Sequence, residues 1–175
     1  MNAVLENIMS RRSCRSYTNK RVSREDLDLI LKAGIYAPSG MNRQTWQFTV
    51  LRKKENILEL ASIIGKALQR PEGYNFYDPD TIILVSNEMD NSNGLADCAC
   101  AMQNMFLMAE SLGIGSCWIN QLKGICGMPQ IRKQLKALGV PDNHVVWGIV
   151  DLGYAAQPKK EAVKKTSVIR FADED

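Results

Sequence analysis

The segment 95–112 limits the possible folds of this 175-residue chain more than any other part of the sequence. It has the pattern of a helix that Gly113 ends as a C-terminal cap. Its few polar residues are scattered around the helical wheel, so no side of the helix is suited to water. Such a helix must be buried on most of its faces. In a domain this small, we therefore expect another subunit to cover part of it.

Helical and extended patterns alternate along the rest of the chain. Asn2 can cap a short helix that runs out near Arg11, and Ser23 begins a second helix that Pro38 ends. The other predicted helices are 55–69 and 129–138, and the predicted strands are 46–51, 81–86, 115–119 and 144–152. Helices that alternate with single strands favour an α/β or α+β sandwich around a central sheet. The length suits one domain.

The composition excludes several classes of protein. With 45% hydrophobic and 23% charged residues, the chain is typical of a globular protein and not of a disordered one. A net charge of +3 is too small to indicate nucleic-acid binding. No segment approaches the roughly 18 apolar residues of a membrane span, and residues 1–12 lack the apolar run of a secretory signal. We expect a cytoplasmic protein with no membrane or nucleic-acid partner.

The five cysteines and the single histidine form no catalytic or metal-binding pattern. An odd number of cysteines without a secretory signal indicates reduced thiols. Cys98 and Cys100 would point to nearly opposite sides of one helix, so they cannot chelate one ion, and we expect both to be small buried residues. His144 begins an apolar strand with no Ser or Cys motif around it, which argues against a catalytic triad or a metal site.

The first motif, at residues 11–17, places three guanidinium groups where a short helix gives way to a loop. Arg11, Arg12 and Arg15 each present a planar fork that pairs bidentately with phosphate. Ser13 adds a hydroxyl and a backbone N–H for the same anion. Such runs are also common on protein surfaces, as solvated basic turns whose surface ion pairs contribute about 0–1 kcal/mol each. The residues alone leave both interpretations open.

The second motif, at residues 38–46, connects the second helix to the first strand. Pro38 stops the helix, Gly40 permits unusual dihedral angles and close backbone approach, and the side chains of Asn42 and Gln44 offer amide donors and acceptors. An ordinary helix-to-strand turn with Trp46 in the core is the alternative. The combination is more elaborate than a connection requires, and we interpret it as a binding turn.

Together these motifs resemble the FMN-dependent nitroreductase family. Arg-Arg-Ser-x-Arg at 11–15 is followed, as in that family, by Ala-Pro-Ser-Gly-x-Asn-x-Gln-x-Trp-x-Phe at 37–48. Asp97, the residues at 103–105 and Gly-Ile-Gly-Ser-Cys-Trp-Ile at 113–119 look like its buried helix and following strand. Residues 148–154 and Pro-Lys-Lys at 158–160 are similar to its last core strand and basic return. The likeness spans nearly the whole chain.

The resemblance implies an α+β fold, a three-layer sandwich with a mainly antiparallel central sheet. It also implies an intertwined homodimer with two FMN molecules at the subunit interface. Residues 1–175 would then form a single FMN-binding domain, in which 155–175 are a C-terminal arm that packs on the partner subunit.

The resemblance further assigns residues to the FMN site. Arg11 and Ser13 match residues at the phosphate, which Lys159 or Lys160 would close, and Arg15 matches a basic residue near the pyrimidine edge with Arg12 beside it. The turn that reaches the ring from the other subunit would comprise Pro38, Ser39, Gly40, Asn42 and Gln44. The segment near the ring's N5 edge would comprise Ser116, Cys117, Trp118 and Ile119. Many members have proline at Thr45, so we expect a looser turn here, and Arg70 is a candidate flavin contact from the 69–80 loop.

The activity implied by the resemblance is an oxidoreductase reaction. A hydride from NADH or NADPH would reach FMN, and a nitroaromatic, quinone or flavin-like acceptor would then be reduced in a ping-pong mechanism. No side chain needs to act as nucleophile or base, and Arg15 would stabilise negative charge. The same flavin scaffold could instead serve dehalogenation, enone reduction or flavin destruction. A different alternative is a non-enzymatic binding module that uses the basic tail of Lys159, Lys160, Lys164 and Lys165.

Overall fold

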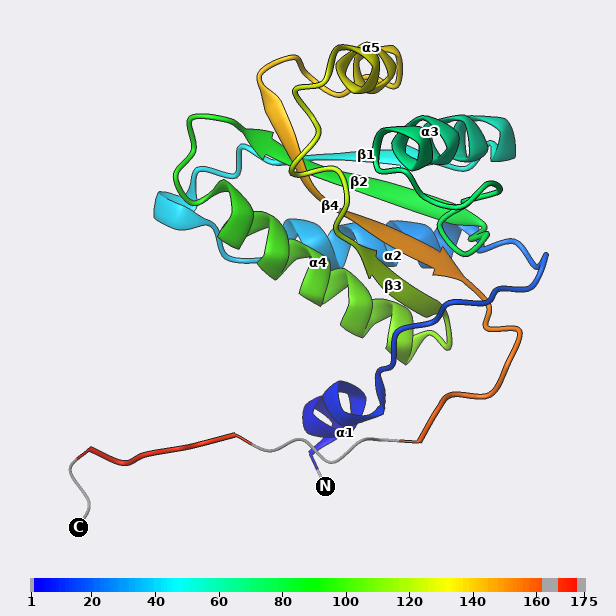
Figure 1. The fold of residues 1–175 in the computed structure, drawn as a ribbon. Coiled ribbons are helices and arrows are strands. Elements are labelled where there is room, and N and C mark those ends of the chain that lie inside the picture. Colours follow the sequence, from blue (N-terminus) through cyan, green and yellow to red (C-terminus); the bar gives the residue numbers. More distant parts are fainter. Residues whose placement is uncertain (1, 162–166, 173–175) are drawn as a thin grey trace.

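Figure 1 shows the computed structural model, which describes residues 2–161 and 167–172. The elements follow in the order α1 (Ala3–Ser10), α2 (Arg24–Ile35), the short 3-10 helix η1 (Gly40–Asn42), β1 (Gln47–Leu51), α3 (Lys54–Ala67), β2 (Thr81–Glu88), α4 (Gly94–Ser111), β3 (Gly115–Ile119), α5 (Pro129–Ala137) and β4 (His144–Gly153). Each predicted helix and strand is present, with ends that differ by a few residues.

The four strands form one sheet in the order β1-β2-β4-β3, and every neighbouring pair is antiparallel. Helices α2 and α4 cover one face of the sheet, and α3 and α5 cover the other (Figure 1). The prediction of a three-layer α+β sandwich is therefore confirmed.

Each face of the sheet has its own apolar core, because successive side chains of a strand point to opposite faces. Ile82 and Leu84 of β2 pack with α3 and α5, whereas Ile83 and Val85 pack with α2 and α4. Strand β2 is consequently buried at every residue except Glu88. A strand covered on both faces is apolar along its whole length, which is the pattern that residues 81–86 show in the sequence.

The helix ends have local causes. The side chain of Asn2 accepts hydrogen bonds from the backbone N–H groups of Val4 and Leu5, and Ser23 Oγ accepts one from Asp26, so both predicted N-caps are confirmed. Helix α3 ends at Ala67, two residues before the predicted end. There Gln69 takes a left-handed φ of 51°, and the N–H of Arg70 turns back to donate to the carbonyl of Gly65.

The two cysteines of α4, which we expected to be buried alike, differ in their exposure. Cys98 is buried against the sheet, but Cys100 is exposed in the single chain, so the expectation that both are buried is wrong for Cys100. Two positions along a helix are about 200° apart, which places Cys100 on the side away from the core. Among the described residues, no three His, Cys, Asp or Glu side chains gather as metal ligands, and no helix is long and apolar enough to cross a bilayer.

Candidate functional site

The N-terminal segment, residues 11–17, runs along the outer edge of the sheet. Ser13 forms a parallel bridge with Ser116 of β3, and Tyr17 forms an antiparallel bridge with Ala155. The N–H of Cys14 donates to the carbonyl of Ser116 at 2.8 Å. Gly115 allows this contact, because a Cβ there would lie 2.9 Å from Cys14 Cβ. Backbone pairing therefore holds the segment in place at the edge of the sheet.

Of the three arginines in the first motif, two remain available to bind an anion. Arg11 and Arg15 make no ion pair within the described residues, and the guanidinium of Arg15 lies 5.9 Å from the centre of the Tyr77 ring. Arg12 instead folds back and donates to the carbonyls of Met9 at 2.6 Å and Arg11 at 2.7 Å. Because its guanidinium closes the end of α1, the structure does not bring Arg12 into the cluster.

A buried carboxyl group, Asp151, lies behind this segment. It pairs in register with Cys117, is fully buried, and neither of its oxygens has a hydrogen-bond partner among the described residues. Burial raises the pKa of Asp151 well above its usual value, and burial with the nearby Asp151 raises the pKa of the Cys117 thiol to about 11. Arg15 and Arg11 act against that rise, so both guanidinium groups lie toward Cys117. Sequence reasoning missed Asp151, although it is the one acid within the apolar run 144–153.

The binding turn, residues 38–45, has an unusual backbone. Met41, Asn42 and Gln44 have left-handed φ angles of 53°, 55° and 52°. Non-glycine residues in this region are strained by about 1–3 kcal/mol each and persist only where the surroundings hold them. Ser39 Oγ accepts a hydrogen bond from the N–H of Gln44 at 3.2 Å, and Gln44 Nε2 donates to Asn42 Oδ1 at 2.7 Å. The exposed amide side chains thus have a defined arrangement.

Buried polar side chains hold this turn from below. The N–H of Gly40 donates to Asp97 Oδ1 at 2.9 Å, and Asn91 Nδ2 donates to Asp97 Oδ2 at 3.2 Å. The hydroxyl of Thr45 also joins Asn91 and Asn87. Contrary to the expectation that Thr45 loosens the turn, its side chain ties the turn to β2. The local turn propensity of the sequence could not predict these hydrogen bonds of Thr45, because its partners lie more than 40 residues away in sequence.

The two motifs lie at opposite ends of α4 within one chain (Figure 1). Asp97, near the start of the helix, holds the binding turn, whereas the carbonyl of Leu107 accepts a hydrogen bond from Asn7 of α1 at 2.9 Å. Ten residues of helix separate these two anchors, which is about 15 Å at 1.5 Å per residue. The two candidate motifs are therefore held apart within a single chain, at the two ends of α4.

The remaining predicted residues lie near the N-terminal segment. In β3, Ser116, Cys117 and Ile119 are buried and Trp118 is 39% exposed, so Trp118 alone presents its side chain. Lys159 pairs with Glu110 at the end of α4, and Lys160 is exposed with no ion pair among the described residues. Arg70 is exposed, and its positive charge acts to lower the pKa of the nearby Tyr74 hydroxyl. Lys164 and Lys165 lie outside the described residues. Pro38 is exposed at the start of the turn.

A solved nitroreductase with bound FMN shares this fold of an antiparallel sheet between two helical layers, which places the chain among the nitroreductase-like proteins. The sequence profile of the nitroreductase family matches residues 8–154, and the chain belongs to that family.

Individual relatives agree with this assignment. A crystal structure of a Bacteroides fragilis nitroreductase with bound FMN is 42% identical, with a TM-score of 0.91 over 99% of this chain and 100% of that one. A nitroreductase with bound FMN from Desulfitobacterium hafniense is 30% identical, with a TM-score of 0.85 over 99% and 100%. A protein from Archaeoglobus fulgidus, provisionally named NADH dehydrogenase/NAD(P)H nitroreductase, is 35% identical over 92% of this chain and 88% of its own length.

Proposed function

We propose that this protein is an FMN-dependent oxidoreductase that takes electrons from NAD(P)H. Family membership and two similar nitroreductases with bound FMN support the cofactor, and the name of the archaeal relative supports the electron donor. The observation that carries the proposal is that Arg11 and Arg15, on a backbone-fixed segment at the sheet edge, form no ion pair with any residue that the structure describes.

The residues present fit a flavin mononucleotide. Its phosphate requires fixed positive charge and hydrogen-bond donors, which Arg11 and the exposed hydroxyl of Ser13 offer at one end. Its polar ring edge requires amide donors and acceptors, which Asn42 and Gln44 expose in the binding turn. Lys159 is engaged by Glu110, which leaves Lys160 as the lysine that closes on the phosphate.

When bound, FMN supplies the two-electron chemistry: it accepts a hydride from NADH or NADPH and passes the electrons to an acceptor. Arg15 provides a permanent positive charge that stabilises negative charge developing nearby. Ser116, Cys117 and Ile119 contribute backbone groups, because their side chains are buried. Arg12 plays no direct part.

The acceptor is a small electron-poor molecule such as a nitroaromatic, a quinone or a free flavin. NAD(P)H and the acceptor use the same place in turn, which gives a ping-pong mechanism. Two reactive groups of the described part of the chain are not arranged for another reaction: the Cys117 thiol is held neutral by its raised pKa of about 11, and His144 bonds to Ser86 inside the protein.

The working unit is a homodimer, because two partial sites from different chains are needed for one complete site. Several apolar side chains are exposed in the single chain where a partner would cover them: Val4, Leu5, Ile8 and Met9 of α1, and Leu95 of α4. Exposed apolar faces of this size mark contacts with another protein. The same contact would bury the outer side of α4, as its sequence requires.

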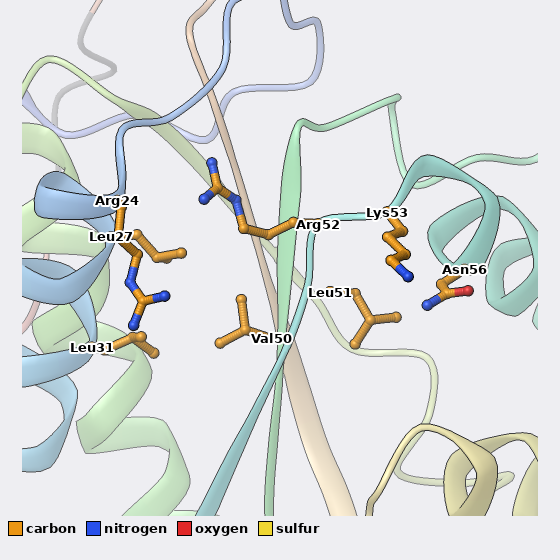
Figure 2. Close-up of a pocket in the computed structure, with 8 residues that line it drawn as sticks. All are labelled: Arg24, Leu27, Leu31, Val50, Leu51, Arg52, Lys53 and Asn56. Carbon is orange, nitrogen blue, oxygen red and sulfur yellow. The ribbon is translucent and has the colours of Figure 1, made fainter.

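The C-terminal arm would exchange between the two chains. Strand β1 is an edge strand, and beside it lies a groove of about 420 Å³ between α2 and the start of α3. Figure 2 shows its walls, with Leu27, Leu31 and Val50 in the apolar part and Arg24, Arg52 and Lys53 at the rim. Residues 167–171 contain Val168, Ile169 and Phe171, which are 94%, 78% and 64% exposed. We expect these apolar side chains to pack into the groove of the partner chain.

Anaerobic titration of the purified protein with NADH and with NADPH tests the function. We expect a yellow protein whose flavin absorbance is bleached by one or both nicotinamides and restored by a nitroaromatic or a quinone. A colourless protein that takes up no added FMN would refute the proposal. A panel of halogenated aromatics and enones, tested against the reduced protein, separates the alternative reductions.

A further inference from the structure

The hydroxyl of Thr45 occupies the centre of a buried polar cluster. It donates to Asn87 Oδ1 at 2.6 Å and accepts from Asn91 Nδ2 at 3.1 Å. Asn87 is fully buried and Asn91 is 4% exposed, so water cannot easily replace these bonds. A hydroxyl has one hydrogen to donate and lone pairs to accept, so Thr45 can serve both asparagines at once.

The same cluster reaches both ends of the binding turn. From the N-terminal end, the N–H of Gly40 bonds to Asp97, and Asp97 accepts from Asn91. From the C-terminal end, Thr45 bonds to Asn91 and Asn87. Asn87 belongs to β2, where it pairs in register with Val145 of β4. Side-chain hydrogen bonds therefore join the two ends of the turn to each other and to the sheet.

The turn needs such a restraint because three of its residues have left-handed φ angles. Proline would restrict the backbone through its ring, but the sequence has no proline between residues 39 and 70. The C-terminal end of the turn is instead restrained by the side-chain hydrogen bonds of Thr45. Thr49, which lies in β1 beyond the end of the turn, accepts from Gln47 Nε2 and takes no part in the cluster.

We propose that Thr45 is a positioning residue for the cofactor, whose hydroxyl locks residues 38–45 in the shape that presents Asn42 and Gln44 to FMN. The choice of ligand rests on the proposed function, whereas the lock itself is a property of the chain. Removal of the hydroxyl takes one hydrogen bond from Asn91 Nδ2 and one from Asn87 Oδ1, so Asn91 keeps its bond to Asp97 and Asn87 keeps its bond from the N–H of Glu88, but neither is still tied to the end of the turn. The turn then opens more often, and the cofactor must order it again on binding.

The first experiment measures hydrogen exchange by mass spectrometry over residues 38–46 in FMN-free protein. Thr45→Val has the same shape without the hydroxyl, Thr45→Ser keeps the hydroxyl, and Thr49→Val removes a hydroxyl outside the cluster. We expect exchange about tenfold faster in Thr45→Val, and within about twofold of wild type in the other two variants. Unchanged exchange in Thr45→Val overturns the lock. Thr45→Ala serves in its place if Thr45→Val does not fold.

The second experiment measures the Kd of FMN and the turnover at saturating FMN. We expect Thr45→Val to raise Kd about tenfold and to keep kcat within about threefold, with Thr45→Ser restoring the wild-type Kd. A wild-type protein that binds no FMN overturns the proposed function and the positioning role, whatever the exchange data show. Fast exchange in Thr45→Val with an unchanged Kd overturns the positioning role while the proposed function stands.

Discussion

Asp97 and Asp151 are both buried carboxyl groups, and each lies beside one of the two candidate motifs, yet their surroundings are opposite. Asp97 lies below the binding turn and accepts hydrogen bonds from Gly40 and Asn91. Asp151 lies behind the N-terminal segment and accepts none from the described residues. The first has the donors that a buried carboxylate requires, and the second does not.

The difference shows how the two partial sites are held. The binding turn must keep a strained shape, so buried polar side chains brace it from within. The N-terminal segment must only present charge, and backbone pairing with β3 suffices for that. Asp151 adds no hydrogen bond to that segment, and its raised pKa favours the neutral acid. The binding turn is therefore held by side-chain hydrogen bonds, and the N-terminal segment is held by backbone hydrogen bonds to the edge of the sheet.

We expect the largest effect on FMN binding from Arg11→Ala, in the N-terminal segment. Loss of a guanidinium that pairs with the FMN phosphate should weaken FMN binding by about 2–4 kcal/mol, or roughly 30- to 700-fold in Kd. Arg12→Ala is the matched control, because its guanidinium is committed to the carbonyls of Met9 and Arg11. Fluorescence titration with FMN measures both. Equal losses in the two variants would contradict the assignment of Arg11.

The two carboxyl groups themselves should respond with opposite signs. Asp97→Asn exchanges an acceptor oxygen for an amide donor that meets the donor groups of Gly40 or Asn91, and should lower the free energy of unfolding by about 1.5–3 kcal/mol. Asp151→Asn removes an acid that is costly to ionise in its buried position, and should raise that free energy at pH 8. Urea denaturation of both variants at pH 8 compares them. A loss of stability in both would show that Asp151 also has a partner.

The packing of the N-terminal segment on β3 gives the next prediction. Gly115→Ala would place a Cβ 2.9 Å from Cys14 Cβ and 3.1 Å from the carbonyl oxygen of Gly153. Because neither backbone can move freely, we expect a loss of about 1–3 kcal/mol in stability, together with weaker FMN binding. Gly124→Ala is the control, since a Cβ there meets nothing within 4 Å. Thermal melts with and without FMN measure the difference.

The pH dependence of stability should be the most modest effect. The folded protein keeps the proton on Asp151 that the unfolded chain releases above about pH 4, so stability falls as the pH rises from there, by about 1.4 kcal/mol per unit of pKa difference. Burial lowers the pKa of His144, so its contribution is present at neutral pH and is lost as the pH falls below about 6.5.

Denaturation of wild type and Asp151→Asn between pH 5 and pH 8 separates the two groups. The variant should lose less stability toward alkaline pH and should keep the fall at acid pH. A variant whose profile matches that of wild type throughout would mean that Asp151 is ionised in the folded state.

The fold was predictable from the sequence because its signals are local. The caps of Asn2 and Ser23 and the apolar run of β2 depend on residues within one element. The end of β2 was not predictable in the same way: Asn87 and Glu88 are polar, but they continue the strand because Val145 and His144 pair with them.

The site was predictable in its motifs and not in its supports. Arg11, Ser13 and the turn residues stand out in the sequence as groups of chemically related residues. The supports depend on which side chains meet in space. This holds for the return of Arg12 onto α1, for the hydrogen bonds of Thr45 and for the lack of a hydrogen-bond partner at Asp151 among the described residues. Thr45 bonds to Asn87, 42 positions away, and no local pattern contains that contact.

Residues 70–80 form a loop whose largest buried side chain is Phe76. Phe76 is completely buried, with its ring at 80° to that of Tyr74, while Phe76, Tyr77 and Asp78 all have left-handed φ angles. Ahead of Phe76, a Cβ at Gly73 would meet no atom within 4 Å. Because Gly73 has open space around it, residues inserted there would lengthen the loop that carries Tyr77, beside Arg15, without removing Phe76 from the core. The loop is thus a natural place to engineer acceptor choice while the scaffold stays unchanged.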